Sequence, residues 1–175
     1  QIERWSRQYR ASETDNIEAM NNLIEWLPKN IPSDDATSIV HGDFRLDNMI
    51  YKNNEVIGVL DWELSTLGHP VADFSYHCLT WRTEPIFYDH PKLKELGVPN
   101  EIEYRDMYSE STGQDLSENW EYYMAFNIFK VAAICQGILG RVRDGTAANK
   151  HAEERGMKVY PLSEGAWSIV ENNFK

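Results

Sequence analysis

Apolar side chains in the first part of the chain recur with the spacing of α-helices. Trp5 and Tyr9 lie four positions apart within residues 1–12, and apolar residues return at helical intervals over 17–27. Because side chains three and four positions apart share a helix face, this spacing predicts two helices. The polar residues of 12–15 carry side chains that cap helix N-termini, so we expect them to begin the second helix.

Turn residues and strand-like segments replace the helical spacing between residues 38 and 63. Residues 38–40 favour a short strand, and the segments "MIY" and "EVIGVL" flank Lys52-Asn53-Asn54. Adjacent asparagines tolerate the left-handed conformation of a tight turn, so we predict a β-hairpin here. Residues 56–60 of its second strand are apolar on both faces, and we expect both faces to be covered.

From residue 70 onward the pattern is helical again. The longest segment, 119–143, is apolar on nearly every face and is therefore expected to run through the centre of the fold. The other helical segments cover 70–82, 100–111, 147–159 and 161–172. The sequence thus predicts an α+β fold that is predominantly helical and contains one small hairpin. Its parts are helices over 1–37, a loop and hairpin over 38–63, and a helical subdomain over 64–175.

Composition limits the partners and the compartment. The chain is 42% hydrophobic with a net charge of −11, so it can bury a core, and it has no basic block for nucleic acid or an anionic membrane. No uninterrupted apolar run has the length of about 20 residues that a membrane-spanning helix needs. Cys78 and Cys135 lie in apolar, helix-like segments, which predicts neither a disulfide framework nor a zinc site. We therefore expect an intracellular, reducing compartment.

Three oxygen-bearing side chains stand at the rims of the predicted strands. Asp43 follows the first strand, Asn48 precedes the hairpin, and Asp61 follows it. Because hairpin strands are antiparallel, Asn48 and Asp61 lie at the same end, and a short loop joins Asp43 to them. Carboxylate and amide oxygens suit Mg²⁺ better than Zn²⁺. We predict a pocket in which Asn48 and Asp61 bind Mg²⁺ and Asp43 accepts a proton from a hydroxyl group.

These residues occur in segments that resemble a known family. "HGDFRLDN" followed by "VIGVLDWE" resembles the catalytic core of the aminoglycoside phosphotransferase and choline kinase superfamily, whose members are relatives of protein kinases. "RWSRQYRAS", "LDWELSTLGHPVADFSY" and "YMAFNIFKVAAICQG" are similar to the kinase-like domain associated with acyl-CoA dehydrogenases. The resemblance covers nearly the whole chain. It implies a kinase-like C-terminal lobe, ATP and Mg²⁺ as cofactors, and a linked acyl-CoA dehydrogenase domain as a partner.

The resemblance also implies a role for each matching position. Asp43 is expected to be the catalytic base that orients the acceptor, and Asn48 and Asp61 are expected to be the Mg²⁺ ligands. His41 is expected to support the loop through hydrogen bonds, and Asp73 to brace the loop from the start of the next helix. Such a protein would transfer the γ-phosphate of ATP to a hydroxyl group of a small molecule.

The part of a kinase that holds the nucleotide is not found in this sequence. The chain contains no GxGxxG loop and no strand lysine of the kinase type, and residues 1–37 have a helical pattern. Because the first helix begins without a preceding cap, we expect a longer polypeptide that supplies an N-terminal lobe. By itself the chain is expected to bind ATP weakly and to be inactive.

The helices after Asp61 are expected to form the acceptor pocket. Asn127 and Lys130 share one face of the central helix. The aromatic and histidine candidates, for which core packing is the competing interpretation, are Tyr76, His77, Trp81, Trp120, Tyr123 and Phe126.

Two acceptor classes fit these helices. A hydroxyacyl-CoA, which the family resemblance favours, needs an apolar groove with basic residues at its mouth. An aminoglycoside needs an acidic pocket, and the acidic residues available for one are Glu84, Asp89, Asp106 and Glu110.

Two further functions stay open. A non-catalytic docking module attached to a dehydrogenase would be marked by a missing metal ligand, whereas Asp43, Asn48 and Asp61 are all present. A metal-dependent hydrolase would need His69 or His77 beside the metal, and their positions favour a turn and a packed helix instead.

Overall fold

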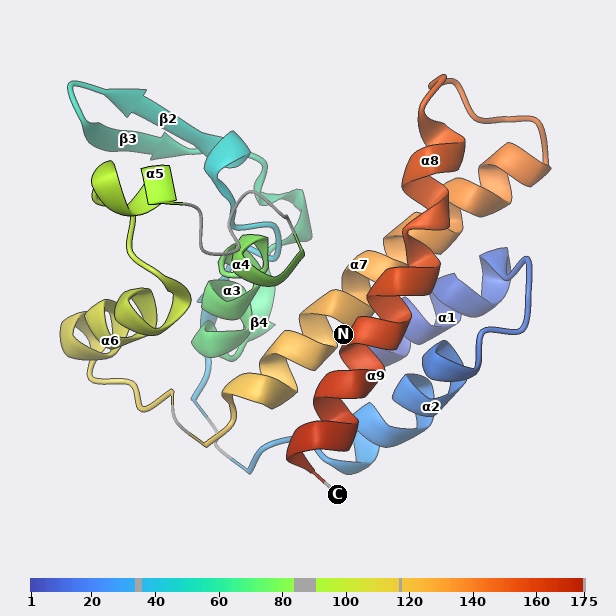
Figure 1. The fold of residues 1–175 in the computed structure, drawn as a ribbon, viewed down its shortest axis with the longest axis horizontal. Coiled ribbons are helices and arrows are strands. Elements are labelled where there is room, and N and C mark those ends of the chain that lie inside the picture. Colours follow the sequence, from blue (N-terminus) through green and yellow to red (C-terminus); the bar gives the residue numbers. More distant parts are fainter. Residues whose placement is uncertain (34–35, 84–90, 117, 175) are drawn as a thin grey trace. The chain divides into compact units, whose positions relative to one another are not determined.

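A computed structural model describes residues 1–33, 36–83, 91–116 and 118–174 (Figure 1). The chain divides into two compact units. We call Gln1–Pro32 together with Met124–Lys175 the helical unit, and Ser33–Tyr123 the mixed unit. The longest helix, α7 (Trp120–Arg143), begins in the mixed unit and continues in the helical unit.

The helical unit is built from amphipathic and buried helices. Its α9 lies beside α2, and the ring centroids of Trp26 and Phe174 are 5.0 Å apart (Figure 1). Besides its share of α7, the unit contains α1 (Ile2–Ser12), α2 (Glu18–Trp26), the 3-10 turn η1 (Leu27–Lys29), α8 (Ala152–Met157) and α9 (Val159–Asn173). The helices predicted over 1–12 and 17–27 are therefore confirmed.

The start of α2 differs from the sequence-based expectation. Its N-cap is Ile17, which makes no side-chain cap hydrogen bond, so the prediction that residues 12–15 cap this helix was wrong. The Asp15 carboxylate instead accepts a hydrogen bond of 2.7 Å from the hydroxyl of Tyr160 on α9, and the Ser12 hydroxyl donates to the carbonyl of Gln8 within α1. The Asp15 and Ser12 side chains thus form hydrogen bonds elsewhere and do not cap α2.

Helix α7 forms the core of the helical unit, as its apolar faces predict. Met124, Ala125, Phe129, Ala132 and Ala133 are all fully buried. By length and composition this helix could cross a membrane, but 78% of its most apolar window is buried inside the protein. Such burial is typical of the core helix of a globular fold.

The mixed unit combines short strands with short helices. Strand β1 (Ser38–Val40) pairs antiparallel with β4 (Thr66–Gly68), and β2 (Met49–Lys52) pairs antiparallel with β3 (Glu55–Val59). The remaining elements are η2 (Leu46–Asn48), η3 (Trp62–Leu64), α3 (Pro70–His77), α4 (Thr80–Thr83), α5 (Pro91–Glu95) and α6 (Glu101–Thr112). The α+β, predominantly helical fold class is confirmed, whereas β4 was not predicted.

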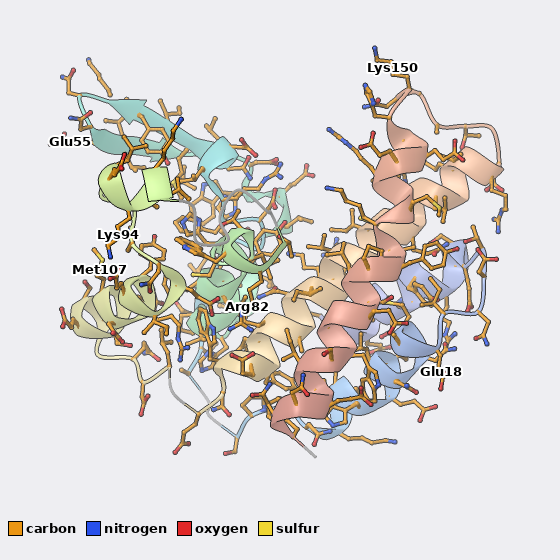
Figure 2. All side chains as sticks on the ribbon, in the orientation of Figure 1. Glu18, Glu55, Arg82, Lys94, Met107 and Lys150 are labelled. Carbon is orange, nitrogen blue, oxygen red and sulfur yellow. The ribbon has the colours of Figure 1, made fainter. Side chains whose placement is uncertain are left out.

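The hairpin forms where its turn residues predict it. Asn53 and Asn54 adopt φ angles of 52° and 64°, and Lys52 pairs with Glu55 across the two-residue turn. Glu55 is labelled at the turn end of the hairpin in Figure 2. Left-handed conformations at both turn positions match the twist of paired strands, so the asparagines specify this turn.

The expectation that both faces of the second hairpin strand are covered was wrong. Val56 is 52% exposed and Ile57 57% exposed, and Leu60, just after the strand, is 51% exposed. A two-stranded ribbon buries little by itself. The apolar pattern shows that burial of this strand is favourable, but it does not identify the surface that would cover it.

A charged cluster ties three helices of the mixed unit together. Arg82 of α4, labelled in Figure 2, donates to the carboxylates of Glu101 on α6 and Glu121 on α7, with contacts of 2.8 Å to each. The indole N–H of Trp120 adds a hydrogen bond of 2.7 Å to Oε1 of Glu101. Each carboxylate is thus paired with the guanidinium, which is the condition for keeping such groups away from water.

Candidate active site

The site is built around the turn His41-Gly42-Asp43, which follows β1. Gly42 has φ of 82°, a conformation that residues with a Cβ rarely adopt. A Cβ atom at this position would lie 2.5 Å from the carbonyl oxygen of Leu64, so there is also no room for a side chain. The glycine therefore allows the chain to turn close to η3 and to present Asp43.

The carboxylate of Asp73 holds this turn from the side of α3. Its Oδ2 accepts a hydrogen bond from the backbone N–H of His41, and its Oδ1 accepts one of 2.8 Å from the N–H of Gly42. Asp73 lies in the first turn of α3, which begins with Pro70 after His69 as N-cap. Two consecutive backbone donors thus share one carboxylate, a contact that suits the loop-supporting role proposed from the sequence.

The imidazole ring of His41 is fully engaged with the protein. Its Nδ1 accepts a hydrogen bond of 3.2 Å from the backbone N–H of Asp43, and its Nε2 donates one of 2.7 Å to the carbonyl of Leu60. The ring is 2% exposed and lies 4.7 Å from the ring of Trp62. With both nitrogens in use, His41 links the turn to the end of the hairpin and is not available as a metal ligand.

Asp43 and Asn48 are in direct contact. The amide nitrogen of Asn48 donates to the carbonyl oxygen of Asp43 at 2.9 Å and to its carboxylate Oδ2 at 3.0 Å. These two acceptors fix the orientation of the amide, because only its NH₂ group can donate to them. The amide oxygen consequently points away from Asp43, and within the described part of the chain no hydrogen bond to that oxygen is found.

Asp61 is brought to the same end of the hairpin. Leu60 precedes Asp61 in the chain, and its backbone N–H donates a hydrogen bond of 2.8 Å to the carbonyl of Asn48. Asp61 itself has φ of 65°, and its side chain makes no cap hydrogen bond to η3. Aspartate is one of the few residues besides glycine that adopt the left-handed region without difficulty. Because the carboxylate does not cap the following turn, the ordinary structural role of an aspartate at a strand end does not explain it.

Tyr76 contacts Asp43, which the sequence did not predict. Its hydroxyl donates a hydrogen bond of 2.7 Å to Oδ1 of Asp43. Burial, followed by the hydrogen bond and charge of Asp43, raises the pKa of the Tyr76 hydroxyl well above its ordinary value, so the donor proton is retained. The signal in the sequence was the spacing of Asp73 and Tyr76, which are three positions apart and share a face of α3.

Arg45 supplies a positive charge at the edge of the site. Its Nε lies 3.4 Å from Oδ2 of Asp43, and Nη1 lies 3.7 Å from Asp47. The Arg45 side chain is 53% exposed, whereas that of Asp43 is 18% exposed. Because exposed ion pairs are weak, this contact adds charge near Asp43 without fixing its position.

The donor set fits a magnesium ion. The amide oxygen of Asn48 and the carboxylate of Asp61 remain free of protein hydrogen bonds within the described residues, and both are hard oxygen donors. The described residues contain no group of three His, Cys, Asp or Glu side chains that could hold a metal. A pair of one carboxylate and one amide is a different kind of site, in which Mg²⁺ would complete its shell with water and phosphate oxygens.

Two of the aromatic residues proposed for acceptor binding, Trp81 and Trp120, pack against other residues of the mixed unit. Trp81 donates to the carbonyl of Pro99 at 3.2 Å and stacks on Tyr104. Trp120 is 1% exposed and is covered by the guanidinium of Arg105, 4.6 Å from its ring centre. These contacts are typical of a structural core, so the core interpretation explains both tryptophans.

The other proposed acceptor residues are distributed over both units. Tyr123 stacks on His69 in the mixed unit, with ring centroids 5.0 Å apart. Asn127 and Lys130 belong to the helical unit, where the Lys130 ammonium lies 5.6 Å from the ring centre of Trp5. Their role in binding an acceptor stays a prediction.

His69 and His77 are not placed as a hydrolase would need them. Nδ1 of His69 accepts a hydrogen bond of 3.2 Å from the N–H of Val71 and so caps α3. His77 packs between Phe44 and Tyr104, and burial lowers the pKa of its ring. Together with the engaged ring of His41, these contacts leave no histidine pair directed at the carboxylates in the part of the chain that the structure describes.

Comparison with known proteins identifies the family of the chain. The phosphotransferase enzyme family matches residues 1–116, and the chain therefore belongs to this family. A crystal structure from Ralstonia eutropha JMP134, provisionally described as an aminoglycoside phosphotransferase, matches with a TM-score of 0.90 and 45% identity. The match covers 99% of this chain and 55% of that one. The kinase-like fold expected from the sequence resemblance is confirmed.

The curated relatives are acyl-CoA dehydrogenase family proteins. Member 10 from Mus musculus is 44% identical over 97% of this chain, and member 11 from Homo sapiens is 35% identical over 99% of it. The chain spans only 17% and 23% of the lengths of these two relatives. The resemblance to the kinase-like domain associated with acyl-CoA dehydrogenases is thereby confirmed.

Proposed function

We propose that this protein transfers the γ-phosphoryl group of ATP to a hydroxyl group of a small molecule in a Mg²⁺-dependent reaction. The observation that carries the proposal is the carboxylate of Asp43, which is 18% exposed and accepts a hydrogen bond from Asn48, whose amide oxygen has no hydrogen bond from the described residues. Asp43 accepts the proton of the acceptor hydroxyl, whose oxygen forms the new bond to the γ-phosphorus as the bond to ADP breaks.

Asn48 and Asp61 would hold the metal. Bound there, Mg²⁺ would neutralise charge on the transferred phosphoryl group and position it. Asn48 donates a hydrogen bond to Asp43, so one side chain would contact both the metal and the base. This connection supports the assignment, because phosphoryl transfer depends mainly on positioning and charge neutralisation.

The acceptor that we favour is a hydroxyacyl-CoA. This choice is supported by the relationship to acyl-CoA dehydrogenase family proteins. The chain spans 17% and 23% of the lengths of the two relatives above. A phosphotransferase linked to such a dehydrogenase would act on an acyl-CoA that carries a hydroxyl group. The linked dehydrogenase domain is part of the same proposal.

An aminoglycoside is the second candidate acceptor, because the solved structure that matches this chain is provisionally described as an aminoglycoside phosphotransferase. Of the acidic residues available to bind it, Asp106 and Glu110 are exposed on α6, and Glu84 and Asp89 lie outside the described residues. The hydroxyacyl-CoA is preferred because the curated relatives are acyl-CoA dehydrogenase family proteins.

Transfer assays test the proposal on the full-length protein as its gene encodes it. ADP release is measured with Mg²⁺ and ATP in the presence of a hydroxyacyl-CoA or kanamycin, and the phosphorylated product is identified by mass spectrometry. Asp43→Asn should lower kcat at least about 100-fold, whereas Asp144→Asn, whose side chain is 57% exposed, should leave it unchanged. Product from kanamycin alone would replace the preferred acceptor, and absence of any phosphorylated product would refute the function.

The same proposal implies weak nucleotide binding by residues 1–175 alone. The sequence contains no glycine-rich loop or kinase-type strand lysine for the phosphates. Calorimetry on this polypeptide should show MgATP binding at least about 10-fold weaker than binding to the full-length protein. Equal affinity would mean that these residues hold the nucleotide without help.

A further inference from the structure

The two oxygens of the Asp43 carboxylate are held by different parts of the mixed unit. Oδ2 receives the amide N–H of Asn48 at 3.0 Å and lies 3.4 Å from Nε of Arg45. Oδ1 receives the Tyr76 hydroxyl at 2.7 Å, the shortest of these three contacts. A carboxylate with a single held oxygen can still rotate, whereas donors on both oxygens define the plane of the group.

Tyr76 is well placed to fix that plane. It lies on α3, the helix whose Asp73 is bonded to the backbone of His41 and Gly42. Helix α3 therefore holds both the turn that carries Asp43, through Asp73, and the Asp43 carboxylate itself, through Tyr76. The half-buried ring is held by its hydrogen bond to Asp43, and such preorganisation is what positioning in catalysis requires.

We propose that Tyr76 is a positioning residue for phosphoryl transfer, which directs the carboxylate of Asp43 toward the acceptor hydroxyl. The inference rests on the proposed function of Asp43 as the base. Tyr76 keeps its own proton and takes no part in the transfer, so its contribution is to the geometry of the reacting pair. Loss of its hydroxyl therefore affects turnover and leaves the binding of nucleotide unchanged.

The test compares variants of the full-length protein with MgATP and a hydroxyacyl-CoA, or with kanamycin if that is the acceptor found. Tyr76→Phe removes only the hydroxyl and should lower kcat about 10-fold to 100-fold, the effect of losing a hydrogen bond to a charged group, with KM for MgATP unchanged. Replacement of Tyr76 by 4-aminophenylalanine keeps a donor at the same place and should restore most of kcat. Tyr104→Phe is the matched control, because the described residues offer its hydroxyl no hydrogen bond.

A double variant separates positioning from general effects on folding. In the Asp43→Asn background, Tyr76→Phe should cause no further loss, because the group that it positions is gone. Thermal unfolding shows whether Tyr76→Phe still folds. If it does not, kcat of the 4-aminophenylalanine protein, which keeps the ring and a donor, is compared with that of the wild type instead.

The results distinguish failure of the inference from failure of the proposed function. If Asp43→Asn abolishes transfer while Tyr76→Phe behaves like Tyr104→Phe, Tyr76 has no positioning role and the function stands. A rise in KM for MgATP without a fall in kcat also overturns the inference. If the wild-type protein forms no phosphorylated product, or Asp43→Asn retains full activity, the proposed function fails and the inference fails with it.

Discussion

The backbone N–H of Gly42 donates a hydrogen bond of 2.8 Å to Oδ1 of Asp73, which lies 31 positions later in the chain. The neighbouring N–H of His41 donates to the other oxygen of the same carboxylate. Through these bonds the first turn of α3 sets the conformation of the loop that carries Asp43.

Replacement of Asp73 by asparagine should loosen this loop. Asp73→Asn places an NH₂ group opposite one of two backbone N–H donors, so one hydrogen bond to a charged acceptor is lost. We expect the free energy of unfolding to fall by about 2 kcal/mol, as measured by urea denaturation, with a parallel loss of phosphoryl transfer. Asp106→Asn on the exposed face of α6 is the control, and equal stability of the two variants would contradict the bracing role.

Gly42→Ala should destabilise the protein more than the same change at another left-handed glycine. At Gly42 the new methyl group meets the carbonyl of Leu64, whereas at Gly113, with φ of 72°, nothing lies within 4 Å of it. Gly113→Ala should therefore cost about 1 kcal/mol from backbone strain alone. Gly42→Ala should cost at least about 1 kcal/mol more. Thermal unfolding measures both, and similar shifts would show that the loop can move away from η3.

The Glu101 cluster should give the stability of the protein a dependence on acidic pH. Burial by itself would raise the pKa of Glu101, but the hydrogen bonds and charge of Arg82 outweigh it, with help from Trp120, and hold this pKa below its ordinary value. A depressed carboxyl pKa stabilises the fold above the ordinary pKa of the unfolded chain, 4.5, and this contribution is lost as pH falls through the lower folded value.

Glu101→Gln tests this dependence. The variant should be less stable than the wild type by about 2 kcal/mol at pH 7, and the difference should shrink as pH falls below about 4.5. Urea denaturation between pH 7 and pH 3 measures it. Glu154→Gln, whose exposed partner His151 lies 3.6 Å away, should have almost no effect at any pH. A stability difference that is constant over this range would show that charge on Glu101 is not its cause.

Asp61→Asn should weaken binding of the divalent ion. Removal of one carboxylate ligand should lower the affinity for Mn²⁺, used as a spectroscopic substitute for Mg²⁺, about 10-fold or more. Electron paramagnetic resonance on the full-length protein with ATP measures free Mn²⁺ directly. Glu55→Gln, at the turn end of the hairpin, removes the same charge away from the site. If both variants bind Mn²⁺ equally well, Asp61 is not a ligand.

Local features of the sequence were sufficient for several elements. The two asparagines of the hairpin turn have the conformations that their type predicts, and the apolar pattern of 119–143 corresponds to the buried helix α7. The proximity of Asn48 to the end of the hairpin also followed from strand pairing alone. These features depend on neighbouring residues or on one tight turn, so a short stretch of sequence is enough to predict them.

Contacts between distant residues were not accessible in the same way. Strand β4 spans three residues and exists through pairing with β1, for example Ile39 with Leu67, and three residues are too few to show alternation. The hydroxyl of Tyr76 reaches Asp43 across 33 positions. Spacing on α3 put Asp73 and Tyr76 on one face, but only the packing of that helix against the loop decided what this face contacts.

The sequence by itself determined the helices, the hairpin and the chemical types of the residues at its rim, because turn preference and periodicity act over a few residues. Tertiary structure alone decided that Asp15 bonds to Tyr160 instead of capping α2, and that Val56 and Ile57 remain exposed. It also decided which donor meets each oxygen of Asp43. The physical reason is that hydrogen bonds and burial between distant segments depend on where the whole chain packs, which no local pattern encodes.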